Sequence, residues 1–594
     1  MSFRRVAGVA AIALATWLEL SCGQVYRPVV IPISITPPNP ANFHAVFGIS
    51  ANVPFNPGTA LQIDVSGDSN IGVANVGVNP THAAILPNNS RVFVASAGSM
   101  FAGNTDVITA FFPAGDSSTA GGLGTTTTFT LPGTGAGQSS SIAAISESSN
   151  LVTVTLSAPL SNALAGAVIG ISSVGVSGYN GIFPISFVNG TTIQYVDSTT
   201  GLAASSGGIA TVPVSCSYLP DFVATTQTNA VFVANYGVEN GLNCNFSSTD
   251  SVAALNPSQG TIGNIAYLPA GSHPVAMVET PNALNLYVLN QGNNTVSDLS
   301  PQDLSTLATI PVGNTPAWAV VRPDNQRVYV VTQGDGQLYT IRTDTNAAGS
   351  PQSVGGAGAN FVLYDKTLNR LYVTNPNAGA VYVFDATTDP PTPMGSATGA
   401  ISIPAPAIPA NTAPCSGGAC SYSSVMPVSV AALPDGTRFY VASYVTAASG
   451  SSCPDPNVAA AGCVVPQVTV FDAGTLTVRT TVFPLLPPVA LPVGGVQPFA
   501  LAPAAFCTPV IPYTPASSRF RMSAVAAVDS SRVYASMCDG GSVAIVAATT
   551  NTIATGVNAA DTLVTDLPAP FSAATAPPSG EPPPQNPVFL LTGQ

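Results

Sequence analysis

Three histidines and nine cysteines are the residues best suited to catalysis or metal binding in this chain of 594 residues. The histidines are His44, His82 and His273, and no cysteine pair lies close to any of them in the sequence. A zinc site needs Cys and His ligands at tight spacing, so we predict no metal site from this pattern. The histidines also lack a convincing carboxylate partner, so the sequence contains no evident acid–base pair.

The acidic residues do not supply a catalytic set either. Glu279 lies in a predicted strand with His273 nearby, and we interpret them as an exposed edge group and a turn residue. No nucleophile elbow, P-loop, dinucleotide fingerprint or haem-attachment motif occurs in a suitable context. We therefore predict no catalytic residue and no cofactor, and favour a protein that is not an enzyme. Five aspartates occupy predicted turns or strand ends, where Asp ordinarily bonds its own backbone: Asp365, Asp385, Asp435, Asp472 and Asp529.

Eight of the cysteines fall into close pairs along the sequence and are candidates for disulfides. They lie in predicted loops or beside predicted strands, as expected of short-range disulfides that tie long loops in an oxidising compartment. A metal site is the weaker alternative, and the sequence leaves the connectivity open. The neighbouring pairs are Cys216 with Cys244, Cys415 with Cys420, Cys453 with Cys463, and Cys507 with Cys538.

Residues 1–22 resemble a bacterial export signal, with a basic start and an apolar run over residues 6–18. Residues 20–23 (LSCG) resemble a lipobox, in which Cys22 becomes the lipidated first residue. Glu19 departs from that pattern, because an apolar residue normally occupies its position. We predict an exported protein, either an outer membrane lipoprotein, periplasmic or at the cell surface, that contacts a membrane only through its lipid anchor. Ordinary signal-peptidase cleavage, without lipidation, is the alternative.

The composition favours a β protein and argues against binding to nucleic acids. Charged residues make up only 7% of the chain, and 27 acidic residues outnumber 14 basic ones. Such a surface repels phosphate backbones, and Lys366 is the only lysine. After residue 18 no apolar run approaches the roughly 20 residues of a spanning helix. The apolar residues instead form short runs that are broken by Gly, Pro, Asn and Thr, as in proteins with many strands.

A strand–turn–strand pattern recurs along most of the chain. Each copy has a short apolar strand, a turn with Pro, Asp or Asn, and an aromatic-Val strand, and a third and fourth strand follow. The aromatic positions 287, 329 and 372 lie about 42 residues apart, a length typical of one propeller blade. A single sheet of this kind cannot bury both faces, whereas sheets packed radially can. The clear copies are 83–96, 319–332, 361–375 and 428–443, and the looser ones are 222–235, 276–290 and 524–536.

The tetrapeptide Tyr372-Val373-Thr374-Asn375 and its counterparts resemble the YVTN-type bacterial β-propellers, which include surface-layer-like propellers and relatives of the seven-bladed lactonases. The resemblance covers roughly residues 43–112 and 216–592. It implies an all-β propeller with seven complete four-stranded repeats, and it places His82 and His273 near the mouth of the central channel. Seven blades with additional terminal strands and eight blades with a composite closure both fit, and we slightly favour seven.

The spacing between the first two repeats is about a hundred residues too long. A Gly/Thr/Ser-rich linker over 114–141 leads into a further set of strands, which we interpret as a small β domain of residues 138–212 inserted in the first blade. A decorated blade loop is the alternative. The predicted order is an export signal (1–22), a Pro-rich linker (23–42), the first part of the propeller (43–137), the inserted domain (138–212) and the rest of the propeller (213–592), with a Pro-rich segment (567–587) before a closing strand.

Three long loops are predicted at 390–426, 445–466 and 484–520, and loops of this length tend to be functional or tied down. If all three open on one face of the propeller, that face is the first candidate for binding. We favour a binding or scaffold protein that engages a protein or glycan. A lactonase-like hydrolase acting on a sugar lactone is the alternative, and a redox or cofactor-carrying propeller is a third option.

Overall fold

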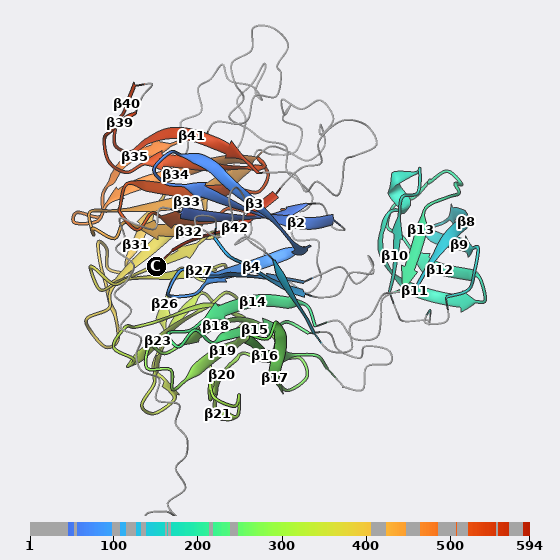
Figure 1. Cartoon of the computed structure of the whole chain (residues 1–594), viewed down its shortest axis with the longest axis horizontal. Helices are drawn as coiled ribbons and strands as arrows, with labels where there is room; N and C mark the ends of the chain where they lie inside the picture. Colours follow the sequence, from blue (N-terminus) through green and yellow to red (C-terminus); the bar gives the residue numbers. More distant parts are fainter. Residues whose placement is uncertain are drawn as a thin grey trace, which may run out of the picture. The chain divides into compact units, whose positions relative to one another are not determined.

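The structure is a computed structural model of the chain. It describes eight radial sheets of a β-propeller and a separate small closed barrel (Figure 1). The predictions for Cys22 and His44 lie outside the described residues. Among the described residues, no helix is long and apolar enough to cross a membrane. The described residues are 45–52, 56–97, 107–113, 126–131, 138–160, 163, 168–212, 218–237, 248–405, 423–446, 464–484, 507, 521–553, 556–569 and 586–593.

Seven of the sheets are complete blades of consecutive antiparallel strands, and in blades 4 and 5 the outermost strand is split in two. From blade 1 to blade 7, each from its first to its last strand, they are: β4 (Pro80–Ile85), β5 (Val92–Ser96), β6 (Val107–Phe111), β7 (Thr127–Thr130); β14 (Pro220–Thr225), β15 (Val231–Asn235), β16 (Ser251–Asn256), β17 (Thr261–Tyr267); β18 (Pro274–Glu279), β19 (Leu286–Asn290), β20 (Thr295–Leu299), β21 (Thr306–Pro311); β22 (Pro316–Val321), β23 (Arg327–Thr332), β24 (Gln337–Arg342), β25 (Ala347–Ala348), β26 (Gln352–Ser353); β27 (Phe361–Asp365), β28 (Arg370–Asn375), β29 (Ala380–Asp385), β30 (Thr392–Pro393), β31 (Ala400–Ser402); β32 (Met426–Ala432), β33 (Arg438–Thr446), β34 (Val464–Asp472), β35 (Val478–Val482); β36 (Ala524–Ala526), β37 (Arg532–Met537), β38 (Ser542–Ala547), β41 (Thr562–Pro568).

The eighth blade is built from both ends of the chain. Its strands, from the innermost outward, are β42 (Asn586–Thr592), β1 (Ala45–Asn52), β2 (Asn56–Asp64) and β3 (Ser69–Val78). β42 and β1 are antiparallel, with Gly48 opposite Leu590. The predicted terminal strands are therefore confirmed, and so is the closing strand near the C-terminus.

The first strands of the eight blades contact one another in a ring, in the order β4, β14, β18, β22, β27, β32, β36 and β42. The all-β propeller with seven complete repeats is confirmed, and its closure is the composite one, which gives eight blades. Our slight preference for seven blades was wrong. The number of blades depends on the pairing of β42 with β1, a contact between residues more than 500 positions apart.

The strands of the aromatic-Val pattern are the second strands of the blades, and their tyrosines fill the space between neighbouring sheets. These tyrosines are buried although each carries a hydroxyl, because the sheets cover both faces of the second strand. They are Tyr287, Tyr329, Tyr372, Tyr440 and Tyr534.

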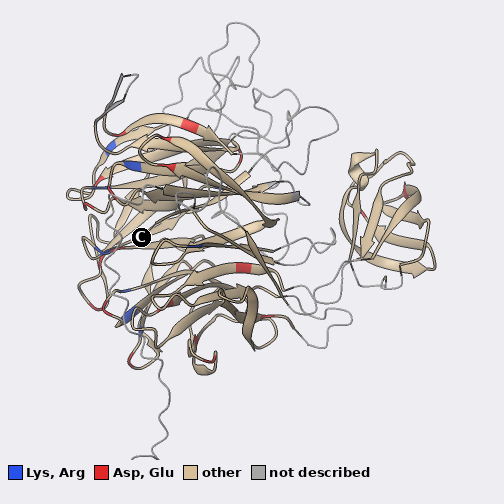
Figure 2. Ribbon diagram, in the orientation of Figure 1, with Lys and Arg blue, Asp and Glu red and all other residues tan. Residues whose placement is uncertain are grey.

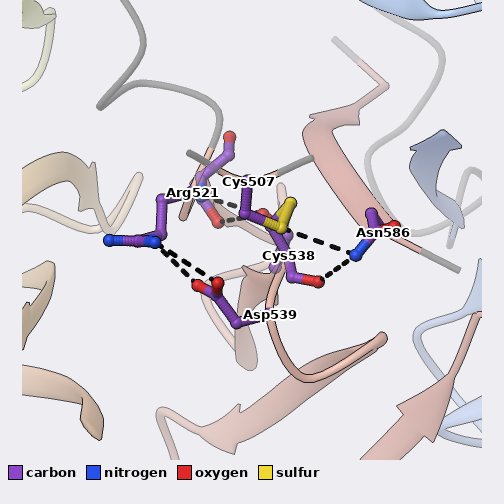
Figure 3. The surroundings of a disulfide bond; sticks show 7 residues. Cys507, Arg521, Cys538, Asp539 and Asn586 are labelled. Atoms are coloured by element: carbon purple, nitrogen blue, oxygen red, sulfur yellow. Dashed lines mark hydrogen bonds and ion pairs between the residues drawn. A yellow bond between two sulfur atoms is a disulfide. The ribbon is translucent and has the colours of Figure 1, made fainter. Parts of the chain in front are cut away.

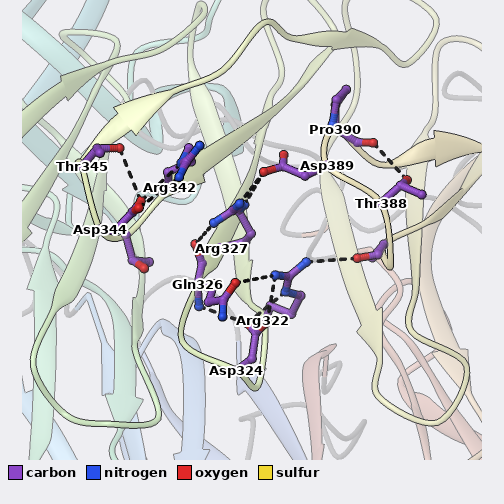
Figure 4. A network of polar contacts seen from close by, with 12 residues as sticks. Arg322, Asp324, Gln326, Arg327, Arg342, Asp344, Thr345, Thr388, Asp389 and Pro390 are labelled. Atoms are coloured by element: carbon purple, nitrogen blue, oxygen red, sulfur yellow. Dashed lines mark hydrogen bonds and ion pairs between the residues drawn. The ribbon is translucent and has the colours of Figure 1, made fainter.

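An arginine at the start of the second strand joins several blades to the next one. Its guanidinium reaches the turn between the third and fourth strands of the following blade, and we call this contact the inter-blade clasp. Most charged residues of the propeller accordingly lie along the edge where the short turns gather (Figure 2), and Figure 4 shows the clasp of Arg327 among its charged neighbours. The clasps are Arg91 to the carbonyl of Pro257, Arg327 to Asp389, Arg370 to the carbonyl of Ala473, Arg438 to Asp561 and the carbonyl of Ala548, and Arg532 to Asp68.

The inserted domain is a closed barrel that follows blade 1. Its strand order is β10-β11-β12-β9-β8-β13, and it has a core of its own around Tyr179 and Tyr195. The prediction of a Gly/Thr/Ser-rich linker over residues 114–141 is partly wrong, because residues 127–130 form the outermost strand of blade 1. The barrel elements are β8 (Gln138–Ser148), β9 (Leu151–Leu156), β10 (Val168–Ser172), a 3-10 turn (Ser177–Tyr179), β11 (Gly181–Asn189), β12 (Thr192–Val196) and β13 (Ile209–Val212).

The last complete blade has an additional hairpin between its third and fourth strands. In this hairpin, β39 (Asn551–Ile553) and β40 (Gly556–Asn558) pair with each other. β41 is the strand that pairs with β38.

Candidate functional site

One residue from each blade lies at the propeller axis, close to the start of the first strand. On β4, β14, β18, β22, β32 and β42 this residue is the second one after a proline, and on β27 and β36 it holds the equivalent place. We call these eight residues the axial set. They are His82, Phe222, Ala276, Trp318, Phe361, Ser429, Ser523 and Phe589.

The aromatic members of the axial set pack against one another. The ring of His82 stacks on Phe222 at 3.7 Å between centroids and lies 4.3 Å from the ring of Phe589. Trp318 lies 5.4 Å from Phe222 and 5.2 Å from Phe361. The backbone N–H of Val223 also donates to Nδ1 of His82 over 3.4 Å. No member of the axial set is a carboxylate, so His82 has no acid partner within it.

The serines of blades 6 and 7 are too small to complete this packing. A cavity of about 10 Å³ remains, lined by Thr81, His82, Trp318, Phe361, Val428, Ser429, Ser523 and Phe589. That volume holds about one water molecule. The described residues at this point of the axis therefore enclose a small, mostly apolar hollow.

His273 occupies a different place in its blade from that of His82. His273 immediately precedes Pro274, whereas His82 follows Pro80 by two residues. The counterpart of His273 in blade 1 is Asn79. Both residues have a left-handed backbone, with φ of 47° for His273 and 52° for Asn79. The proline pattern is the signal that sequence reasoning missed, because it marks both the axial residue and the residue before each first strand.

A carboxylate does lie next to His273, which the sequence did not reveal. Nδ1 of His273 is 3.3 Å from Oδ1 of Asp250 and 3.0 Å from the carbonyl oxygen of Tyr236. The rings of His273 and Tyr236 stack, with 4.4 Å between their centroids. Asp250 is fully buried, and its Oδ2 accepts the backbone N–H groups of Gly271 and Ser272. The structure thus forms a His–Asp pair between blades 2 and 3.

The neighbours of His273 fix the position of its proton. Both groups facing Nδ1 are acceptors, so Nδ1 carries the hydrogen and Nε2 is the basic nitrogen when the ring is neutral. A histidine that is oriented by a buried carboxylate in this way is suited to accept a proton or to bind a cation through Nε2. Among the described residues, however, no group of three or more His, Cys, Asp or Glu side chains is arranged to hold a metal ion.

We expect Asp250→Asn to lower the free energy of unfolding by about 1–2 kcal/mol, because hydrogen bonds to a charged acceptor are stronger than those to a neutral one. Urea unfolding of the chain measures the loss. The matched control is Asp365→Asn, which changes a carboxylate bonded only to its own turn. Equal losses in the two variants would contradict a special role for the buried pair.

The five turn aspartates behave as predicted. Each accepts a backbone N–H from a residue two or three positions ahead, so each caps its own turn. Glu279 does not behave as predicted, because it is partly buried instead of exposed, and burial raises its pKa to about 7. It ends β18, six residues after His273, and so lies about 20 Å from His273 along the strand. The aspartate bonds run from Asp365 to Thr367, Asp385 to Thr387, Asp435 to Thr437, Asp472 to Thr475 and Asp529 to Ser531.

The described strands that border the three long predicted loops end on the same face of the propeller. In antiparallel blades, the connections from fourth to first strand and from second to third strand emerge together, and the connections after β31, β33 and β35 are of these two kinds. The connections to the barrel, after β7 and before β14, emerge there as well. We call this side the loop face, and His273 and the proline-marked strand starts lie on it. The first of the predicted loops is partly wrong, because residues 392–393 and 400–402 form β30 and β31.

One of the four predicted cysteine pairs is described, and it forms a disulfide between Cys507 and Cys538 (Figure 3). Asn586, at the start of the closing strand, donates to the carbonyl of Cys538 over 2.8 Å. Arg521 and Asp539 form a buried ion pair beside it, with 2.9 Å between Nε and Oδ2. The candidates outside the described residues are Cys216, Cys244, Cys415, Cys420, Cys453 and Cys463.

Known proteins resemble this chain only at low sequence identity and low structural similarity. No model of a known protein family matches the sequence, and no curated protein matches it. The chain is 15% identical to the hydrazine synthase of Kuenenia stuttgartiensis over 59% of this chain and 86% of that one, with a TM-score of 0.37. It is 11% identical to the dihydro-heme d1 dehydrogenase NirN over 74% of this chain and 73% of that one, with a TM-score of 0.34. Such similarities do not indicate what this chain binds or does.

Proposed function

We propose that the chain is an exported, surface-associated β-propeller that binds a protein or glycan through its loop face and catalyses no reaction. The observation that carries the proposal is the contrast between the two candidate regions. The axis is packed with aromatic and small side chains, whereas the long loops and the barrel connections all emerge on one face. Loops held by a rigid scaffold are the usual place for a binding site.

The export signal and the sequence resemblance add support for the location. The stretch around Cys22 resembles a lipobox, and the Tyr372-Val373-Thr374-Asn375 strand resembles YVTN-type surface propellers. A diacyl anchor at Cys22 would hold the protein on a membrane while the propeller remains in the aqueous phase. Cell fractionation tests this, because Cys22→Ala moves the protein from the membrane to the soluble fraction if the anchor exists.

A hydrolase remains the alternative function because of the His273–Asp250 pair, in which a buried carboxylate orients a histidine. A general base needs this arrangement, together with a substrate within reach of Nε2. Hydrolysis of a sugar lactone by the purified chain, lost in His273→Gln, would replace the binding proposal with this one.

Binding is tested with envelope preparations of the producing bacterium, treated with protease or with periodate before use. The expected result is retention of the wild-type chain, abolished by protease for a protein partner or by periodate for a glycan. A variant with residues 138–212 replaced by a short Gly/Ser linker examines the barrel's part in binding. The matched control is Arg342→Ala, since Arg342 is half exposed at a turn away from the loop face. Retention that Arg342→Ala weakens as much as the loop-face changes do would contradict the proposal.

A further inference from the structure

The closing strand completes the propeller ring. β42 is the innermost strand of its blade and pairs with β1, and the register shifts between Ile49 and Ser50. A strand held by one neighbour opens more readily than a strand with neighbours on both sides.

The start of β42 rests on the disulfide of blade 7. The amide of Asn586 donates to the carbonyl of Cys538 over 2.8 Å and lies 3.5 Å from Sγ of Cys507. Val588 on β42 and Ala51 on β1 pack against the same two cysteines in one buried cluster. We call Ala51, Cys507, Cys538, Asn586 and Val588 the closure contact. Three of its members come from β1 and β42, and Asn586 is the first residue of β42.

The disulfide determines the shape of this contact. Cys538 follows β37 and precedes β38, whereas Cys507 lies in the connection that leads to β36. Without the bond between them, nothing covalent would hold Cys507 against that turn of blade 7. The turn also receives Arg521, whose carbonyl accepts the N–H of Cys538 and whose guanidinium pairs with Asp539. The ion pair helps to fix the turn. The disulfide holds Cys507 beside Cys538, so that Asn586 and Val588 contact both cysteines.

From this geometry we infer that the Cys507–Cys538 disulfide is a latch for ring closure, so that β42 is held firmly only in the oxidised protein. Formation of the bond removes two protons and two electrons from the two thiols, and a disulfide of a thiol-exchange protein takes them up and becomes a dithiol. The oxidising compartment that such a partner requires is the one expected for an exported chain. The latch is independent of what the loop face binds.

Hydrogen exchange tests the latch in the full mature chain, with peptides from β42 and β1 compared with peptides from β19 and β23. We expect Cys507→Ala/Cys538→Ala to speed exchange in β42 by about tenfold or more and in blades 3 and 4 by less than about twofold. Arg370→Met serves as the control, because it removes the clasp between blades 5 and 6 and leaves the closure contact intact. In the Arg370→Met variant, we expect faster exchange mainly in blades 5 and 6.

The contact with Asn586 supplies the decisive comparison. In the oxidised protein, Asn586→Ala should speed exchange in β42 about fivefold, the effect of one lost hydrogen bond. In the cysteine double variant the same substitution should add less than about twofold, because the contact is already lost. If the double variant does not fold, the folded wild type is reduced with a phosphine and the free thiols are blocked before exchange. Uniform acceleration across all blades, no acceleration, or an undiminished effect of Asn586→Ala would each overturn the latch.

Discussion

Replacing Arg532 by Met should lower the free energy of unfolding by about 3 kcal/mol, one of the two largest effects expected for a single substitution in the propeller. Arg532 is fully buried, and its guanidinium donates two hydrogen bonds of 2.8 and 2.9 Å to Asp68 in the next blade. Methionine keeps the apolar stem but leaves the carboxylate without its cation. The value is at the lower end for a broken buried ion pair because Asp68 retains some contact with water.

The control for this prediction is another arginine of the same face. Arg342 and Asp344 also form an ion pair, with 3.0 Å between Nη2 and Oδ2, but both side chains are at least half exposed. Arg342→Met should therefore cost about 0.5 kcal/mol or less. Adding Asp68→Asn to Arg532→Met removes the unpaired charge and should restore part of the loss. Urea unfolding followed by circular dichroism measures all four proteins, and similar losses in Arg532→Met and Arg342→Met would contradict the prediction.

The inter-blade clasp also explains the positions of several arginines in a chain that has few charged residues. Five of its arginines begin the second strand or immediately precede it, and each one binds the turn of the following blade. The apolar faces between blades account for most of the buried surface, but they do little to fix the orientation of one blade against the next. A guanidinium that must meet a specific carbonyl or carboxylate fixes how each blade is positioned against the next.

Local sequence patterns were sufficient to predict the blades. The strand of Tyr372 and its counterparts alternates with turns at a constant spacing, and each blade is formed by residues that are close in the sequence. The number of blades was beyond such reasoning. It depends on the sum of eight packing angles and on β42 meeting β1 across nearly the whole chain, and no local pattern contains that information.

The candidate site was predictable only in part, for a similar reason. His82 lies near the axis because the start of a first strand faces the axis in every blade. The pairing of His273 with Asp250 was not predicted, since the two residues are 23 positions apart and immediately precede strands of adjacent blades. The partial burial of Glu279 was missed because a residue at the end of a strand has no sequence feature that reports how the neighbouring blade covers it.

Glu279 should make the propeller less stable as the pH rises from about 5 to about 7. Burial is the main cause of its raised pKa of about 7, and the nearby N–H of Gln227 and hydroxyl of Thr226 offset only part of it. Between the unfolded pKa of 4.5 and this value, the folded chain retains a proton that the unfolded chain has lost. Stability is therefore highest below the unfolded pKa, falls across this window, and levels off above it. The full loss is about 3 kcal/mol, at 1.36 kcal/mol for each pKa unit.

Glu279→Gln isolates this effect, because a neutral amide of the same size imitates the protonated acid at every pH. The variant should exceed the wild type by about 1 kcal/mol or less at pH 5 and by about 3 kcal/mol at pH 8. Asp385→Asn is the control, since the hydroxyl and backbone N–H of Thr387 lower the pKa of Asp385, and its contribution is lost only in more acidic solution. Urea unfolding at pH 5, 6, 7 and 8 measures the three proteins. A constant difference between Glu279→Gln and the wild type would show that the carboxyl does not titrate in this window, and that the blade 2 turn leaves it in contact with water.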